Sequence, residues 1–209
     1  INGIMGMLDI IRKNRQDEAK VDDCLDKINL SASHLLALVN DVLDMNKLES
    51  GKETIESASF DLTHLMDDVA SLVNAQITEM GITHCTHRGE LTHTRLIGSP
   101  LRLRQIMLNL FSNAIKYNKP GGMIDTYAGE VSCDGTRVVY EFRITDSGIG
   151  MSSEFIEKEL FHPFTQEKSG ARTQYKGTGL GMSIVKELIE KMQGTICLLY
   201  TSPSPRDCS

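Results

Sequence analysis

Two short glycine-rich stretches, DSGIGM at residues 146–151 and GTGLGM at 177–182, contain the residues best suited to chemistry. Glycine lacks a Cβ, so its backbone can adopt positive φ and approach a bound ring or phosphate closely. The second stretch opens a segment of helical spacing, with Thr178 available as a cap. A helix N-terminus presents free N–H groups to an anion. Together the stretches indicate a nucleotide pocket, although each alone is equally typical of a turn with a bulge.

A periodic apolar segment at residues 100–117 predicts a helix that points two carboxamides and an ammonium in one direction. Ser99 precedes it as a cap, and the proline at its first turn misses no hydrogen bond. At about 100° per residue, Asn109, Asn113 and Lys116 fall within roughly 60° of one another and away from the apolar stripe. Amide oxygens with water suit a hard cation such as Mg²⁺, and a nearby lysine supplies charge for phosphates.

Four motifs occur in order: NLFSNAIKY at residues 109–117, DSGIG at 146–150, FHPFTQ at 161–166 and GTGLG at 177–181. They resemble the N-box, the first glycine box, the F-box and the second glycine box of sensor histidine kinases. These kinases share an ATP-binding fold with gyrase, Hsp90-type chaperones and MutL. The resemblance extends from the first residue to about Ile196, and it implies an ATP-dependent kinase of two-component signalling, simple or hybrid.

The resemblance also implies roles for individual residues. Asn113 would ligate Mg²⁺ with help from Asn109, and Lys116 would contact phosphate, so these three form the expected catalytic group. Tyr117 would lie against the adenine of ATP, and Asp146 would accept a hydrogen bond from the adenine amino group. The other expected cofactor-binding residues are Gly148, Gly150, Phe161, Phe164, Gly177, Thr178, Gly179, Leu180 and Gly181.

Residues 151–176 are expected to form a lid over this pocket, with a short helix ending near Leu160. We expect Phe161 and Phe164 to anchor the lid by docking in the core. Three cations in the lid are either phosphate contacts or ordinary solvated charges: Lys168, Arg172 and Lys176.

Asn109 helps to separate two kinds of enzyme within the resemblance. ATP-hydrolysing relatives have a glutamate four residues before the metal-binding asparagine, and this glutamate activates water. An amide cannot act as a general base, and a phosphoryl donor must protect its γ-phosphate from water. The sequence therefore favours a histidine kinase over an ATPase. A nucleotide-binding or dimerisation module without kinase activity is a further alternative.

The first 51 residues predict an antiparallel helical hairpin. Apolar residues at steps of three and four, from Leu25 to Val42, form the seam of a helical bundle. Two helices cannot close a four-helix core, so we expect a homodimer; packing of the hairpin on its own second domain is the alternative. By the resemblance, the phosphoacceptor histidine would precede Ile1, and none of the six histidines present takes its place. We therefore expect a chain truncated at its N-terminus that cannot autophosphorylate alone.

The predicted fold class is α+β: this hairpin at 1–51, half of a dimeric four-helix bundle, then an ATP-binding two-layer sandwich at 52–196 with a mixed sheet and three helices. Residues 197–209, rich in Ser-Pro, suit no strand and are expected to be a non-native tail that leaves the sheet without its closing edge. His84, Cys85, His87 and His93 could suggest zinc, but alternating His and Thr on an exposed strand explains them better.

Composition and charge limit the classes of partner that this chain is expected to bind. The net charge is −6, with no long basic run, which argues against nucleic acid. No apolar run has the length that spans a bilayer, so we expect no membrane contact by this piece, although its parent could be membrane-anchored. Five scattered cysteines favour a reduced compartment, the cytoplasm. The predicted function is phosphoryl transfer from Mg-ATP to a histidine and then to an aspartate of a response-regulator receiver domain.

Overall fold

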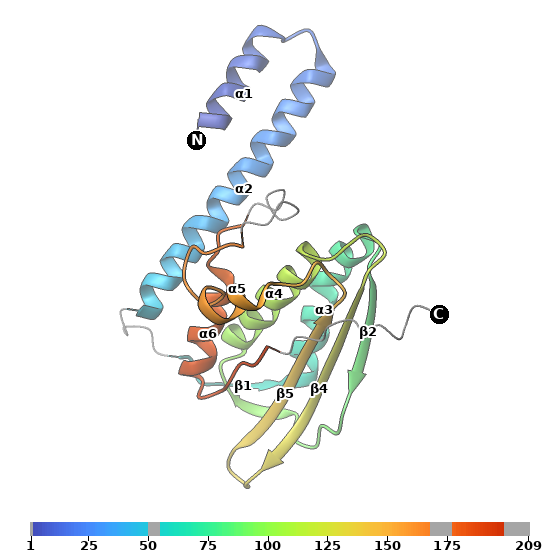
Figure 1. Cartoon of the computed structure of the whole chain (residues 1–209), viewed down its shortest axis with the longest axis vertical. Coiled ribbons are helices and arrows are strands. Elements are labelled where there is room, and N and C mark those ends of the chain that lie inside the picture. The colour runs from blue at the N-terminus through green and yellow to red at the C-terminus, as the bar shows by residue number, and fades with distance from the viewer. Residues whose placement is uncertain (1, 50–54, 168–176, 199–209) are drawn as a thin grey trace. The chain divides into compact units, whose positions relative to one another are not determined.

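A computed structural model describes residues 2–49, 55–167 and 177–198. The chain divides into two compact units, a hairpin unit, Ile1–Lys52, and a sandwich unit, Glu53–Ser209. The predicted boundary between residues 51 and 52 falls outside the described residues. Each unit has its own set of elements (Figure 1).

The hairpin unit consists of α1 (Asn2–Lys13) and α2 (Glu18–Glu49), joined by a short turn. The two helices run antiparallel and pack on each other (Figure 1). Cys24 on α2 is buried, whereas much of the apolar stripe of α2 is exposed to solvent. The exposed apolar residues of the two helices are Met5, Leu8, Ile10, Leu25, Leu30, Leu35, Leu36, Val39 and Leu43.

The sandwich unit opens with β1 (Ala58–Asp61) and α3 (Leu62–Glu79). Asp61 caps α3, because its side chain accepts hydrogen bonds from the N–H groups of Thr63 and His64. Gly81, at φ 63°, follows the end of the helix.

The remaining elements are two strands, a helix, two more strands and two helices. They are β2 (Thr83–Arg88), β3 (Arg95–Gly98), α4 (Pro100–Lys116), β4 (Met123–Cys133), β5 (Val138–Asp146), α5 (Ser153–Lys158) and α6 (Gly181–Lys191). The main sheet has the order β2-β4-β5; β2 runs parallel to β4, and β4 runs antiparallel to β5. β1 and β3 form a separate antiparallel pair.

The core lies between the main sheet and the helices α3 and α4. It consists of the buried face of α3, the buried face of α4 and Ile124 on β4. These faces follow the apolar spacing of the sequence. α6 packs against α4 and buries Ile184, Val185 and Leu188. The predicted α+β class, a helical hairpin followed by a mixed sheet with helices, is confirmed.

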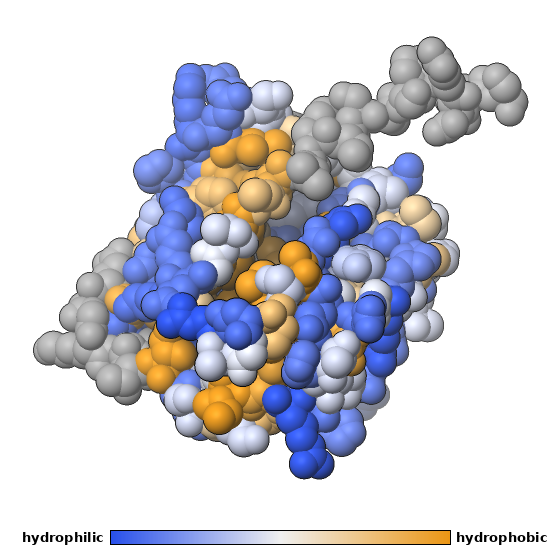
Figure 2. All heavy atoms as spheres, turned by 90° about the horizontal axis from the view of Figure 1, so that it is seen from below, coloured by the Kyte–Doolittle hydropathy of each residue, from blue (hydrophilic) through white to orange (hydrophobic). Residues whose placement is uncertain are grey.

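Residues 195–198 form no strand, so β5 pairs only with β4 among the residues that the structure describes. The sequence predicted this open edge. Figure 2 shows apolar side chains gathered in the middle of the lower face, around a hollow. Val139 and Phe142 on β5 are both exposed.

Candidate nucleotide site

Helix α4 carries the two asparagines and the lysine on the side opposite its core residues. Ser99 accepts the N–H of Arg102, at 3.4 Å, and the proline at the first turn follows this cap. Asn109, Asn113 and Lys116 are each half-buried. Four buried residues of the helix belong to the core: Met107, Phe111, Ala114 and Ile115. Ile106 is also buried, but at about 100° per residue it lies roughly 20° from Asn113, on the polar side. The helix therefore separates a core face from a largely polar face, as its spacing predicts.

The polar face of α4 meets the second glycine stretch. A Cβ at Gly177 would collide with the ammonium of Lys116, and a Cβ at Gly181 would lie 3.8 Å from Oδ1 of Asn109. Lys116 also lies over the ring of Tyr117, with Nζ 4.8 Å from the ring centre. The structure thus brings an ammonium and an amide from α4 against the residues that open α6.

The first glycine stretch is fastened to the end of α4. The N–H of Ile149 donates to the carbonyl of Tyr117 at 3.1 Å. Gly148 packs so closely there that a Cβ would collide with the same carbonyl. Asp146, the last residue of β5, accepts the N–H of Gly148 at 2.9 Å through Oδ1, which orients its exposed carboxylate. Gly150 has φ 64°, a conformation that favours glycine.

The second glycine stretch is held by the segment that follows α5. The N–H of Phe164 donates to the carbonyl of Gly179 at 3.0 Å, and the Gln166 side chain donates to the carbonyl of Gly177. Gly179 has φ 71°, and a Cβ there would lie 2.8 Å from the carbonyl oxygen of Thr165. Gly179 is therefore needed here for close backbone approach.

The start of α6 differs from the prediction that Thr178 caps it. The N-cap is Leu180, whose side chain has no hydrogen-bonding atom, and the Thr178 hydroxyl instead accepts the N–H of Leu180 at 3.1 Å. Thr178 therefore stabilises the turn before the helix. The first N–H groups of α6 receive no bond from the cap side chain and suit an anion.

The sequence suggested that Phe161 and Phe164 both dock in the core. The structure does not show this. Phe161 is half-buried, with Nζ of Lys186 lying 5.4 Å from its ring centre. The Phe164 side chain is 66% exposed, and its backbone has φ 63°. Phe164 holds the segment through its N–H, so its ring is not needed as an anchor. Lys168, Arg172 and Lys176 lie outside the described residues.

Asn118 is a positioning residue that the sequence did not reveal. It is 1% exposed. Its Nδ2 donates to the carbonyl of Met123 at 3.1 Å, and its Oδ1 accepts the Ser147 hydroxyl at 3.2 Å. Ser147 in turn accepts the N–H of Met123 at 2.8 Å. This network ties the end of α4 to the first glycine stretch. In the sequence, the Pro-Gly-Gly turn at residues 120–122 was the only sign of this network.

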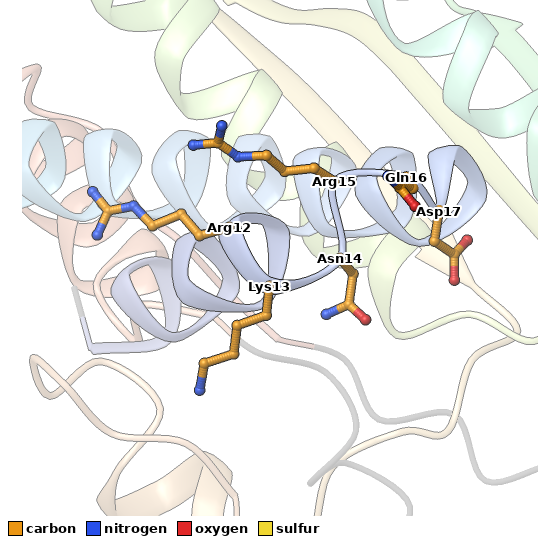
Figure 3. Close-up of a pocket in the computed structure, with 6 residues that line it drawn as sticks. All are labelled: Arg12, Lys13, Asn14, Arg15, Gln16 and Asp17. Carbon is orange, nitrogen blue, oxygen red and sulfur yellow. The ribbon is translucent and has the colours of Figure 1, made fainter.

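A hollow of about 470 Å³ also occurs at the turn of the hairpin unit, lined by Arg12, Lys13, Asn14, Arg15, Gln16 and Asp17. Figure 3 shows that the long side chains spread away from one another and do not converge on the hollow. It therefore has the character of an open, solvated turn rather than a ligand site.

The arrangement in the sandwich unit is suited to a nucleotide with a bound cation. Amide oxygens of Asn109 and Asn113 are ligands that Mg²⁺ accepts, and the cation usually keeps several waters. Lys116 and the N-terminus of α6 supply positive charge beside them. The close-packed glycines leave backbone rather than side chains along the walls, which is what a bound ring or phosphate requires.

Comparison with known families agrees with this geometry. Residues 98–207 match the family described as histidine kinase-, DNA gyrase B-, and HSP90-like ATPase, and residues 1–51 match the His Kinase A (phospho-acceptor) domain. The chain belongs to the histidine kinase-type ATPase family. The resemblance inferred from the four motifs is thereby confirmed.

Curated histidine kinases are similar over nearly the whole chain. Hybrid signal transduction histidine kinase B of Dictyostelium discoideum is 36% identical over 196 residues, which cover 94% of this chain and 10% of that protein. The signal transduction histidine-protein kinase BarA of Escherichia coli is also 36% identical over 196 residues, covering 94% of this chain and 21% of BarA. The chain thus spans between a tenth and a fifth of these two relatives.

Solved histidine kinases have the same fold. Full-length ShkA in complex with AMPPNP matches with a TM-score of 0.65 and 28% identity, over 92% of this chain and 38% of that one. ThkA in complex with the response regulator TrrA matches with a TM-score of 0.67 and 23% identity, over 91% and 50% of the two chains. Within the described part of this histidine kinase-type chain, no helix is long and apolar enough to cross a membrane.

Proposed function

We propose that the sandwich unit binds Mg-ATP between the polar face of α4 and the two glycine stretches. The observation that carries this proposal is the meeting of α4 with the second stretch: Lys116 lies against Gly177, and Asn109 lies beside Gly181 at the start of α6. Phosphates placed there would contact an ammonium and helix N–H groups together. Names of relatives support the same reading, since ShkA was solved with AMPPNP.

Within this site, each polar group has a distinct role. Asn113, assisted by Asn109, ligates Mg²⁺ through amide oxygens, and Lys116 binds phosphate. Tyr117 lies against the adenine, and Asp146 accepts the hydrogen bond of the adenine amino group. Gly148 and the second glycine stretch allow the nucleotide to approach the backbone, as their close contacts favour.

The intact parent transfers the γ-phosphoryl group of ATP to a histidine, releasing ADP, and then to an aspartate of a response regulator. Catalysis consists of positioning and charge stabilisation; Asn113 and Asn109 would hold the metal, which would supply positive charge for the phosphates. Asn109 favours this transfer over hydrolysis because an amide cannot deprotonate water. The relatives named as signal transduction kinases support this assignment. Since ATP is the donor, we expect the reaction in the cytoplasm.

The hairpin unit forms the homodimer. Exposed leucines and valines on α2 continue the apolar stripe that a second hairpin would cover, and Leu36 is 63% exposed. Residues 1–51 match the phospho-acceptor domain, which supports the hairpin as the site where a response regulator docks in the parent.

The decisive experiment is equilibrium binding of AMPPNP to the purified chain with and without Mg²⁺. We expect Mg²⁺-dependent binding that Asn113→Ala abolishes, because the variant removes a metal ligand. Asn74→Ala is the matched control, since Asn74 is an exposed asparagine on α3. Unchanged affinity in Asn113→Ala would overturn the metal assignment, and steady ATP turnover would favour an ATPase instead.

A further inference from the structure

Three ligand atoms of different chemistry meet at the far end of the β4–β5 hairpin. His93, from the loop after β2, offers an imidazole nitrogen, Glu130 a carboxylate oxygen and Cys133 a sulfur. All three atoms lie within 4.8 Å of one another. This is the one such group of at least three His, Cys, Asp or Glu residues found among the described residues. None of its members belongs to the nucleotide site.

A β-bulge is what places Glu130 and Cys133 on the same side of β4. In a regular strand, residues three apart point to opposite faces. Here Glu130 pairs with Tyr140, and Ser132 pairs with Val139, so β4 uses two residues where β5 uses one. The extra residue reverses the alternation beyond it. Bulges of this kind re-aim side chains and occur often beside functional sites.

The carboxylate of Glu130 is held in place before any ligand arrives. Its Oε2 accepts the N–H groups of Thr92 and His93, at 3.1 and 3.0 Å, and its Oε1 lies 2.9 Å from Nδ1 of His93. The side chain is only 12% exposed. These bonds fix the position of the carboxylate before any ion binds.

The other two groups are also positioned. The Tyr140 hydroxyl donates to the carbonyl of His93, which fastens the loop to β5. The sulfur of Cys133 accepts the N–H of Gly135 at 3.4 Å, which helps to orient it. His93 and Cys133 are exposed, so an ion can reach them from solvent.

We propose that His93, Glu130 and Cys133 bind a Zn²⁺ ion, with water as the fourth ligand. Nitrogen, oxygen and sulfur in one site suit zinc, whereas Mg²⁺ and Ca²⁺ prefer oxygen alone. Bond lengths of about 2.0–2.3 Å put the ligands of a tetrahedral site roughly 3.5 Å apart. The ligand atoms lie within 4.8 Å of one another, so they would need to approach by only about 1 Å. The ion would fasten the loop at residues 89–94 to the β4–β5 hairpin.

The test is zinc binding to the reduced, metal-free chain, in competition with a chromophoric chelator. We expect one Zn²⁺ per chain. Loss of an outer-shell partner already costs about 10–100-fold in metal affinity, so Cys133→Ser and His93→Gln should each weaken binding at least tenfold. Cobalt(II) in the same site should give a thiolate-to-metal charge-transfer band that Cys133→Ser removes.

Two controls come from the chain itself. His87 forms the same kind of pair with a carboxylate, 2.9 Å from Asp125, but it belongs to no group of three possible ligands among the described residues. Cys197 is an exposed thiol elsewhere. His87→Gln and Cys197→Ser should leave zinc affinity unchanged. Absence of binding, or an equal loss in the controls, would overturn the proposal. If His93→Gln does not fold, the cobalt band of the Cys133→Ser variant decides, with circular dichroism as its folding check.

Discussion

Gly148 occupies a position where any side chain would collide with the end of α4. Its hypothetical Cβ meets the carbonyl oxygen of Tyr117, and that carbonyl also accepts the N–H of Ile149. A methyl group would therefore push the first glycine stretch away from α4. The pocket wall depends on this contact because Asp146 and Tyr117 are positioned on either side of it.

We expect Gly148→Ala to destabilise the fold by about 1–3 kcal/mol, the usual cost of overpacking, and to weaken AMPPNP binding. Urea unfolding and nucleotide titration measure the two effects. Gly98→Ala is the control, because a Cβ there would make only an ordinary contact, 3.5 Å from the Phe60 ring. Equal behaviour of the two variants would show that the close approach is not needed.

Asp146→Asn tests the adenine contact. The change replaces a charged acceptor, and a hydrogen bond to a charged group is worth about 1.5–3 kcal/mol. We expect ATP affinity to fall about tenfold or more, with GTP affected less because its ring presents an oxygen at the matching position. Competition titrations with both nucleotides measure the ratio. An equal loss for ATP and GTP would contradict an adenine-specific role.

Residue-scale prediction succeeded where helical periodicity determined direction. Asn109 and Lys116 could be placed on one face because α4 is long and strongly periodic. Asn118 could not be found in this way, since its burial depends on Met123 and Ser147, which approach it only in the folded sheet. The pairing of His93 with Glu130 and Cys133 escaped the sequence for the same reason, and it also needs a bulge.

At the scale of elements, the turn between β4 and β5 is stabilised by one carboxylate. The Asp134 side chain accepts the N–H groups of Arg137 and Thr136, at 2.7 and 2.9 Å. These bonds, that of Arg137 first, lower the pKa of Asp134 to about 2. A lowered folded-state pKa means that the stabilisation is complete above the unfolded-state pKa and disappears as the pH falls through about 2.

We therefore expect Asp134→Ala to destabilise the chain at neutral pH, with a difference from the parent that shrinks as the pH falls from about 4 towards 2. Urea unfolding of both proteins across this range measures it. A difference that stays constant with pH would show that the charge of Asp134 is not involved. Thr136→Ala keeps the carboxylate and its backbone bonds but removes the hydroxyl bond to Oδ1, at 2.8 Å, so it should show a smaller pH-dependent difference than Asp134→Ala.

Element boundaries were predicted best where a capping side chain was present. Asp61 and Ser99 each cap the helix that follows. The start of α6 was misplaced because Thr178 has the chemistry of a cap, yet the turn around Gly179 uses its hydroxyl two residues before the helix. Phe164 was misplaced because its apolar side chain suggested burial, whereas its backbone makes the contact.

At the scale of the whole molecule, the exposed apolar residues of the hairpin unit indicate how two chains associate. Leu36 and Leu30 on α2 are 63% and 73% exposed. At about 100° per residue, Leu30 lies roughly 120° away from Leu36 and outside the apolar stripe. Exposure alone therefore does not identify the dimer interface, but the direction in which a residue points from α2 does.

We expect Leu36→Glu to raise the dimer dissociation constant at least about tenfold, because a charge would be buried in the bundle. Leu30→Glu should have little effect. Sedimentation equilibrium of the parent and both variants measures the constants. Dissociation by both variants, or by neither, would favour the alternative in which the stripe packs within one chain.

The edge of β5 that pairs with no other described strand has a consequence for handling the protein. Its outward N–H and C=O groups offer a template to any extended chain, and Val139 adds apolar surface. Glu141 and Arg143, ion-paired on the same strand, oppose flat stacking. Self-association through this edge would be second order in protein. Its rate would therefore rise with the square of the protein concentration during purification, and added short β-strand peptides would slow it by occupying the edge.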